Sequence, residues 1–222
     1  MTTTRLYLVR HGATQLSAED RFSGDIGAEL SAEGRSQAEH LAARMRDDDI
    51  RAIYCSPLSR AVETARIIAG GSGLEPTSCD GLREIRHGHW EGLTRHDVET
   101  RFADEYAAWE ADPFTFAPEG GENGLSVMAR ALPAIRAIVK RHPGETVAVI
   151  SHKATIRLVL SSLLGIDPRG YRDRLDQAPA CLNVVDFKDP VRARLMVYND
   201  TSHYADWPRH VTSNLSKWWD QK

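Results

Sequence analysis

Five short apolar runs alternate along the chain with longer segments of helical periodicity, and this alternation restricts the fold more than any other feature. The runs are rich in Val, Ile, Leu and aromatic residues and cover residues 5–9, 51–56, 146–151, 182–187 and 193–198. Strands that alternate with helices favour a parallel or mixed sheet covered on both faces. We therefore predict an α/β protein, specifically a three-layer α/β/α sandwich with a mostly parallel central sheet and one antiparallel edge strand.

Capping residues mark where the helices begin and end. Ser31 is an N-cap for a helix that extends to about Arg46, and Ser56-Pro57 opens a helix that ends at Ala69. Further helices are predicted over residues 95–110, 124–141 and 154–164, the last of them ended by Gly165. The short connection Lys188-Asp189-Pro190 between the last two apolar runs suits an antiparallel hairpin at one end of the sheet.

The length and composition are typical of a single globular domain. With 222 residues, 41% of them hydrophobic, the chain can bury a full core, and we expect one domain over residues 1–222 with a tail from about residue 205. The net charge of -3 gives no indication of nucleic-acid binding, and no segment is apolar enough to cross a membrane. We expect a small-molecule partner.

The cysteines and the tail suggest where the protein works and how it assembles. Cys55, Cys79 and Cys181 are scattered, without a Cys-x-x-Cys spacing, and no N-terminal signal peptide is evident. We therefore expect a reducing, cytoplasmic compartment. Trp218 and Trp219 in the tail are interpreted either as packing residues or as a contact in a homodimer.

Two of the apolar runs end on a histidine. Arg10-His11 follows the first run, and His152 follows the run over residues 146–151. The carboxyl ends of the strands are where open α/β sheets bind ligands, so both imidazoles are expected at the same edge. Arg10-His11 is a candidate nucleophile beside its anion clamp, and Gly12 would let the backbone approach an oxyanion without a Cβ in the way.

Two further charged residues are expected at this edge. Arg60 falls in the first helical turn after the run over residues 51–56, where its charge opposes the helix dipole, and a bound anion would offset that cost. Its guanidinium could hold two phosphate oxygens at once. Glu84, within Arg83-Glu84-Ile85-Arg86, would be read as a surface charge if the segment stood alone. The convergence of these segments is what favours a phosphate-handling site.

Four motifs follow one another along the chain: Leu8-Val9-Arg10-His11-Gly12, Ser56-Pro57-Leu58-Ser59-Arg60-Ala61, Leu82-Arg83-Glu84-Ile85 with Trp90-Glu91-Gly92, and Val149-Ile150-Ser151-His152. In this order and approximate spacing they resemble the histidine phosphatase superfamily, the phosphoglycerate-mutase-like proteins. The resemblance spans nearly the whole chain, because Arg21-Phe22-Ser23-Gly24 with Leu30-Ser31, Pro118-Glu119-Gly120-Gly121-Glu122 and Asn199-Asp200-Thr201-Ser202-His203 also look like family segments.

The resemblance implies a role for each residue of the core motifs. His11 would become phosphorylated, while Arg10, Arg60 and His152 would bind the phosphoryl group. Glu84 would protonate the leaving alkoxide and then take a proton from water. The resemblance implies no metal and no other cofactor, because the cationic side chains balance the charge of the transferring group.

The resemblance also implies phosphate-binding roles for other positions, at two of which this sequence has an unusual residue for the family. Gly12, Ser17, Ser23 and Gly24 fall where family members offer donors to the phosphate, but Ser17 stands where many have asparagine. Lys153 is also assigned to phosphate binding and stands where glycine is commoner.

Different roles are expected for the remaining polar residues near the motifs. His87 is expected to face the substrate, whereas His89 is expected to be structural. Glu122 and Asn123 either rim the pocket or open the following helix.

The leading functional hypothesis is a phosphatase acting on a small phosphomonoester through a phosphohistidine on His11. A mutase is the nearest alternative, but residues 95–117 are short and largely acidic or apolar, which favours water as acceptor. A metallohydrolase that binds its metal through Glu84, His87, His89 and His152 is another alternative. It is disfavoured because the sequence offers no paired aspartates to complete a two-metal site. A non-catalytic phosphate-binding module is disfavoured because nucleophile, clamps and proton shuttle are all present. Sugar phosphates, phosphoserine, phosphoglycerates and nucleotide-precursor phosphates all remain open as substrates.

Overall fold

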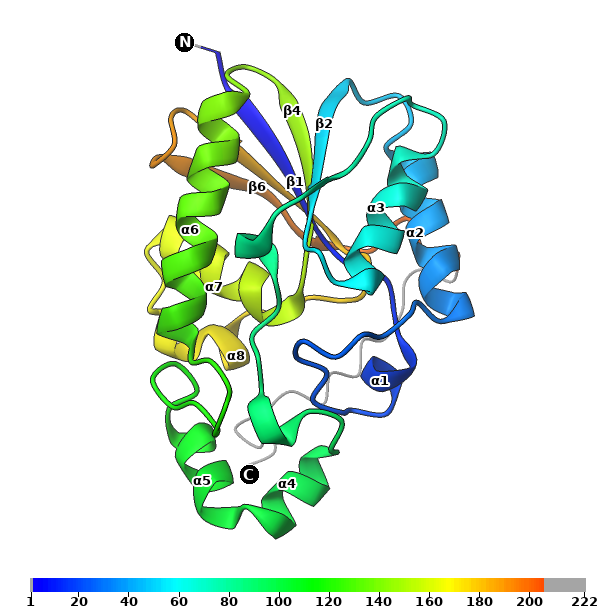
Figure 1. Ribbon diagram of the computed structural model, residues 1–222. Helices are drawn as coiled ribbons and strands as arrows, with labels where there is room; N and C mark the ends of the chain where they lie inside the picture. The colour runs from blue at the N-terminus through cyan, green and yellow to red at the C-terminus, as the bar shows by residue number, and fades with distance from the viewer. Residues whose placement is uncertain (1, 206–222) are drawn as a thin grey trace.

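The five apolar runs form strands of one central sheet in the computed structural model, which describes residues 2–205 (Figure 1). A sixth, two-residue strand joins them, and the order across the sheet is β3-β2-β4-β1-β5-β6. The bounds are β1 (Thr4–Arg10), β2 (Ile50–Cys55), β3 (Thr77–Ser78), β4 (Thr146–Ser151), β5 (Leu182–Phe187) and β6 (Ala193–Asp200). Strands β3, β2, β4 and β1 are parallel, and β5 runs antiparallel to both β1 and β6. The predicted mixed α/β sheet with its antiparallel hairpin is confirmed.

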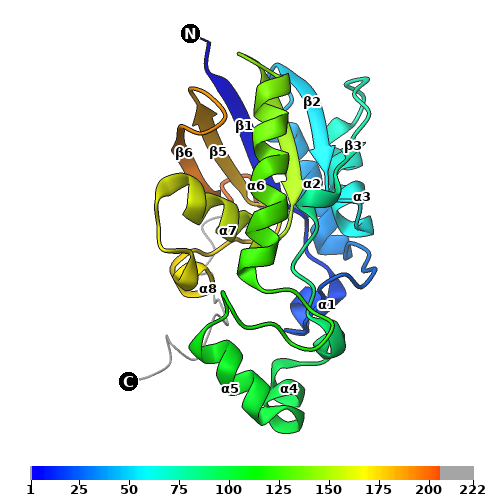
Figure 2. The same ribbon diagram turned by 60° about the vertical axis from the view of Figure 1, so that its left-hand side comes forward.

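Helices cover both faces of this sheet, as Figures 1 and 2 show. On one face α6 (Gly124–Arg141) and α7 (Lys153–Leu164) bury Leu6 and Leu8 of β1. On the other face α2 (Ala32–Arg44) and α3 (Ser59–Ala69) bury Tyr7 and Val9. Successive side chains of a strand point to opposite faces, so a continuous apolar run supplies both layers.

Several helix boundaries follow the predicted capping residues. Ser31 caps α2 by accepting a hydrogen bond from the amide of Gly34 at 3.0 Å. Asn123 caps α6 in the same manner through the amide of Ser126, so its role is to open the helix. Gly165 ends α7 in the left-handed conformation, as predicted.

Other boundaries differ from the prediction. The single helix predicted over residues 95–110 is wrong: α4 (Arg95–Arg101) and α5 (Ala103–Ala111) are separated at Phe102, which leaves helical geometry and packs against an aromatic cluster. Helix α3 begins only at Ser59, beyond Ser56-Pro57. Two single-turn helices, α1 (Gln15–Ala18) and α8 (Tyr171–Arg174), and 3-10 turns at Asp80–Leu82, Gly88–Trp90 and Pro168–Gly170 were not predicted. Periodicity does not detect elements this short.

A small aromatic cluster holds α4 and α5 beyond the carboxyl edge of the sheet (Figure 1). Phe22, Trp90, Tyr106 and Trp109 form its buried part, and Phe22 contacts Trp109 edge to face with 5.6 Å between ring centroids. Edge-to-face contacts of this kind favour a fixed arrangement. The cluster therefore gives the region in front of the strand ends a rigid outer wall.

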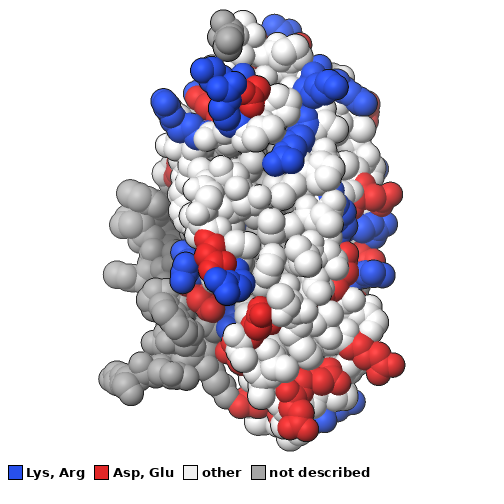
Figure 3. All heavy atoms as spheres, turned by 90° about the vertical axis from the view of Figure 1, so that its left-hand side faces the viewer, with Lys and Arg blue, Asp and Glu red and all other residues white. Residues whose placement is uncertain are grey.

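Charged side chains form separate groups on the face drawn in Figure 3, with wide uncharged areas between them. Basic side chains predominate toward the top of this view and acidic side chains toward the bottom. Within residues 2–205, no helix combines the length and the apolar character needed to span a bilayer. Trp218 and Trp219 lie outside the described residues.

Candidate active site

Adjacent parallel strands bring the two predicted histidines together. Strands β1 and β4 pair in a register that sets Arg10 opposite Ser151, so His11 and His152 leave the sheet side by side. Their ring centroids are 5.0 Å apart, and the amide of His11 donates to the carbonyl of Ser151 at 3.0 Å. Both side chains are buried, His11 at 5% exposure and His152 at 0%. The predicted pairing of the two imidazoles is thus present in the fold.

His11 is arranged as a neutral imidazole with one nitrogen available. Its Nδ1 lies 2.7 Å from the carbonyl oxygen of Gly12, which can only accept, so Nδ1 carries the proton and Nε2 keeps its lone pair. Burial, followed by the charges of Arg60 and Arg10, holds the pKa of His11 well below its ordinary value of 6.5. The ring therefore remains uncharged and nucleophilic at neutral pH.

His152 is buried without a hydrogen bond. Neither of its ring nitrogens has a partner within the described part of the chain. Burial and the neighbouring cations, Arg60 first, also hold its pKa well below the usual range. Because buried polar nitrogens are normally satisfied, His152 is a candidate to form a hydrogen bond with a ligand.

Two arginines supply positive charge that no carboxylate among residues 2–205 pairs with in an ion pair. Arg60, fully buried in the first turn of α3, donates to the carbonyl oxygens of Ile26 at 2.9 Å and Gly24 at 2.7 Å. Arg10 donates to the carbonyl of Gln177 at 2.7 Å. The Nε of each guanidinium is buried without a hydrogen-bond partner among residues 2–205. The carbonyl oxygens orient these side chains but carry no formal charge, so the positive charge of each guanidinium can still attract an anion.

Glu84 reaches the amino terminus of α7 from the segment that follows the 3-10 turn at Asp80–Leu82. Its Oε1 accepts from the amides of Ile85 and Thr155, and Oε2 accepts from the amide of Ala154 at 3.2 Å. The Thr155 hydroxyl donates to the neighbouring Arg83 carbonyl at 2.6 Å. Arg130 holds the backbone carbonyl of Glu84 at 2.9 Å. Amides at a helix start favour a carboxylate, so α7 fixes the position of this group.

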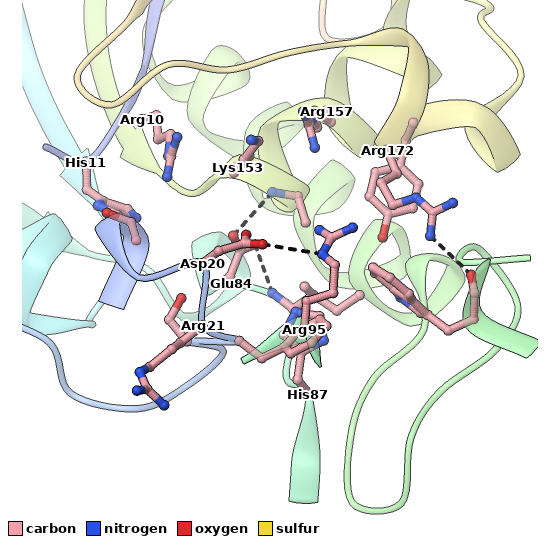
Figure 4. A pocket seen from close by; sticks show the side chains of 17 residues that line it. Arg10, His11, Asp20, Arg21, Glu84, His87, Arg95, Lys153, Arg157 and Arg172 are labelled. Atoms are coloured by element: carbon pink, nitrogen blue, oxygen red, sulfur yellow. Dashed lines mark hydrogen bonds and ion pairs between the residues drawn. The ribbon is translucent and has the colours of Figure 1, made fainter. Parts of the chain in front are cut away.

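These groups meet at one cavity of about 190 Å³ (Figure 4). Arg10, His11 and Glu84 line it, together with His87 and Lys153. Arg60 and His152 are fully buried and do not line it. The ring of His152 lies 5.0 Å from that of His11, and the charge of Arg60 helps to lower the pKa of His11. The structure therefore gathers all five predicted catalytic residues in one region.

The glycines assigned to phosphate binding are used differently. The amide of Gly12 donates to the Thr64 hydroxyl at 3.1 Å, and a Cβ at this position would overlap the backbone of Gly34. Close packing against α2 is therefore a second reason for glycine at position 12, beside the expected approach to an oxyanion. Gly24 offers its carbonyl oxygen to Arg60. It orients an arginine, and it does not line the cavity.

The two serines of the first loops lie at the cavity. Ser17 lines it, but its hydroxyl accepts from the amide of Thr14 at 2.9 Å and donates to the Thr14 carbonyl at 2.8 Å. That capping box commits the hydroxyl to the short helix α1. Ser23 also lines the cavity.

The two histidines of the His87-x-His89 segment have separate surroundings. His87 lines the cavity, contacts Phe22 edge to face, and burial lowers its pKa to about 4. His89 instead faces Glu119 and lies 3.1 Å from Glu105. Among residues 2–205 no group of three or more His, Cys, Asp or Glu side chains is arranged to hold a metal ion.

Sequence reasoning missed part of the cavity wall. Arg157 of α7 and Arg172 of α8 line the cavity and were not predicted. Thr155, whose amide donates to Oε1 of Glu84, was not predicted either. A signal for one of them was present: Lys153 and Arg157 stand four residues apart, which puts them on the same side of a helix. The orientation of Arg172, whose guanidinium lies 4.5 Å from the ring centroid of Trp109, depends on contacts distant in sequence.

Comparisons with known proteins agree with this arrangement. The family model of the histidine phosphatase superfamily (branch 1) matches residues 6–201. Phosphoserine phosphatase 1 of Hydrogenobacter thermophilus is 34% identical over 163 residues, covering 73% of this chain and 77% of that protein. Adenosylcobalamin/alpha-ribazole phosphatase of Escherichia coli is 29% identical over 196 residues, covering 88% and 95%.

Solved structures show the same fold. YhfR of Bacillus stearothermophilus superposes with a TM-score of 0.85 at 31% identity, covering 90% of this chain and 98% of that one. The mycobacterial glucosyl-3-phosphoglycerate phosphatase in complex with VO3 superposes with a TM-score of 0.79 at 29% identity, covering 88% and 98%.

Proposed function

Because this chain belongs to the histidine phosphatase superfamily (branch 1), we propose that it hydrolyses the phosphate monoester of a small metabolite through a phosphohistidine on His11. The observation that carries the proposal is the neutral His11 ring, with Nε2 free, next to two arginines that have no ion-pair partner among residues 2–205. The phosphatase names of the relatives support hydrolysis as the reaction class.

In the first step, Nε2 of His11 attacks phosphorus and the bond from phosphorus to the ester oxygen breaks. The departing oxygen takes a proton from the carboxyl of Glu84. Positive charge develops on the imidazole, and the hydrogen bond from Nδ1 to the Gly12 carbonyl stabilises it. Arg10 and Arg60 balance the charge on the phosphoryl oxygens, and the neutral ring of His152 donates a hydrogen bond to one of them.

In the second step, water attacks the phosphorus of phosphohistidine and gives a proton to Glu84. The N–P bond breaks, inorganic phosphate leaves, and His11 returns to its neutral form. Oε2 of Glu84 is suited to carry this proton, because it accepts one amide N–H whereas Oε1 accepts two. The same carboxyl thus serves as acid and then as base.

The test combines phosphate release with trapping of the intermediate. A panel of cellular phosphomonoesters identifies the best substrate by kcat/KM, and acid-labile, base-stable phosphohistidine is then trapped in the wild-type protein and in His11→Ala. We expect the trapped species and phosphate release in the wild type only. His40→Ala, which removes an exposed imidazole on α2, is the matched control and should behave as the wild type.

Each alternative function has its own signature in this experiment. Formation of a positional isomer in place of inorganic phosphate would identify a mutase. Loss of activity in EDTA would indicate a metallohydrolase, and binding of esters without turnover would indicate a phosphate-binding module.

A further inference from the structure

Helix α7 carries two cations into the cavity beyond the residues assigned to phosphoryl transfer. Lys153 and Arg157 both line it, and in Figure 4 they follow Arg10 across the pocket in the direction away from His11. Arg157 is only 4% exposed. Its Nε is buried without a hydrogen-bond partner among the described residues.

These two cations share one carboxylate. Nζ of Lys153 lies 3.3 Å, and Nη2 of Arg157 lies 3.0 Å, from the same oxygen, Oδ1 of Asp176. One negative charge therefore faces two positive charges. Burial, and after it the charges of Arg157 and Arg10, lowers the pKa of Lys153 to about 8, which reflects this excess.

The other cations of the cavity wall are balanced by acids. Arg172 lies 3.0 Å from Asp173 and 3.4 Å from Glu110. Arg95 lies 3.5 Å from Asp20 and 3.9 Å from Glu110. The unbalanced positive charge outside the His11 region is therefore concentrated at Lys153 and Arg157.

We propose that Lys153 and Arg157 form a second anion subsite, which binds a carboxylate or a second phosphate of the substrate while the ester phosphate lies at His11. This inference rests on the proposed phosphatase function. The small cavity places both subsites within one small molecule. A metabolite with two anionic groups, such as a phosphorylated acid or a bisphosphate, can pair with the cations at both subsites. A phosphorylated alcohol without a second anionic group leaves the excess positive charge at Arg157 buried and unpaired by substrate.

The test compares esters in matched pairs that differ only in the second anionic group. Phosphoserine against phosphoethanolamine tests the carboxylate, and 1,3-propanediol bisphosphate against 3-hydroxypropyl phosphate tests the second phosphate. In the wild type we expect kcat/KM to favour the doubly anionic member of at least one pair by about tenfold or more, the scale of one charge-assisted hydrogen bond. The favoured pair identifies the anion.

The variants show whether the two cations cause this preference. Lys153→Met alters a partly exposed side chain, and Arg157→Met removes the buried one; in each, the kcat/KM ratio within the favoured pair should fall toward one. Asp176→Asn, which removes the shared negative charge, should raise the ratio. Lys140→Met, an exposed lysine near the end of α6, is the matched control and should keep the wild-type ratio.

Two outcomes would overturn the subsite. One is a wild type that hydrolyses both members of every pair equally well. The other is a Lys153→Met protein that loses activity toward both members by the same factor, because that result would assign Lys153 to the ester phosphate. Absence of turnover with every ester in the panel and with p-nitrophenyl phosphate would instead contradict the proposed function.

Discussion

Gly12 and Gly34 pack backbone against backbone, which joins the loop after the candidate nucleophile directly to helix α2. A Cβ on Gly12 would overlap the carbonyl oxygen of Gly34, and one on Gly34 would overlap the carbonyl oxygen of Ala13. Ser31, the N-cap of α2, also donates its amide to Ala13 at 2.9 Å. The first turn of α2 therefore fixes the backbone on which His11 stands.

Gly34→Ala should disturb this contact. Backbone atoms leave no flexible side chain to move aside, so we expect a loss of about 1–3 kcal/mol in the free energy of unfolding, together with a lower kcat. Chemical denaturation and steady-state kinetics measure the two effects. Gly27→Ala is the control, because a Cβ there meets nothing within 4 Å. Equal behaviour of the two variants would show that α2 and the His11 loop are not coupled.

Arg60→Ala should lower kcat/KM by about a hundredfold or more, because it removes a preorganised donor to the transferring phosphoryl group. Arg60→Lys keeps the positive charge but loses the planar guanidinium that the Gly24 and Ile26 carbonyls hold in place. Its kcat/KM should lie between those of the wild type and Arg60→Ala. Arg66→Ala, an exposed arginine on the same helix, serves as control. Near-normal turnover of a folded Arg60→Ala protein would remove Arg60 from the site.

Glu84→Gln should separate the two chemical steps. With an alkyl ester, which needs a proton on its leaving oxygen, kcat should fall by about 10²–10⁴. With p-nitrophenyl phosphate, whose leaving group needs no acid, His11 should still be phosphorylated and the phosphohistidine should accumulate, since water is no longer deprotonated. Rapid-quench trapping measures the intermediate, with the exposed Glu75→Gln as control. Equal losses for both esters and no accumulation would argue against proton transfer by Glu84.

Acid should destabilise the protein through its buried histidines. The pKa values of His11, His87 and His152 all lie below 6.5 in the folded state, so these rings are neutral there, whereas in the unfolded chain each takes up a proton near pH 6.5. The unfolded state then binds more protons, so the free energy of unfolding is fully retained above this pH and falls below it, by at most about 1.4 kcal/mol per pH unit for each ring.

Denaturation at a series of pH values measures this slope. Between about pH 6.5, where His87 titrates in the unfolded chain, and about pH 4, its pKa in the folded protein, unfolding lets this ring bind one proton. His87→Gln should therefore lower the number of protons taken up on unfolding by about one in this pH range. Ser36→Ala, which alters an exposed side chain without removing a titrating group, should leave the slope unchanged. A slope that is identical in the wild type and in His87→Gln would contradict a neutral, buried His87.

The sequence by itself determined the layers of the fold and the edge at which the candidate chemistry lies. Apolar runs ending in Arg10-His11 and in His152 define strand ends, and parallel strands necessarily bring their carboxyl ends to one edge. Local capping residues such as Ser31 and Gly165 could be read in the same way, because the groups that make a cap are only a few residues apart.

Only the tertiary structure decided how individual polar groups are used. The Arg60 guanidinium is held by the carbonyls of Gly24 and Ile26, and the break at Phe102 follows from packing in the aromatic cluster. The excess charge at Arg157 depends on where Asp176 lies. Periodicity and capping report interactions within a few residues of the chain, whereas these outcomes depend on partners brought close by strand register and helix packing. Residue type and spacing could therefore indicate the reaction centre, but not the charge balance around the rest of the cavity.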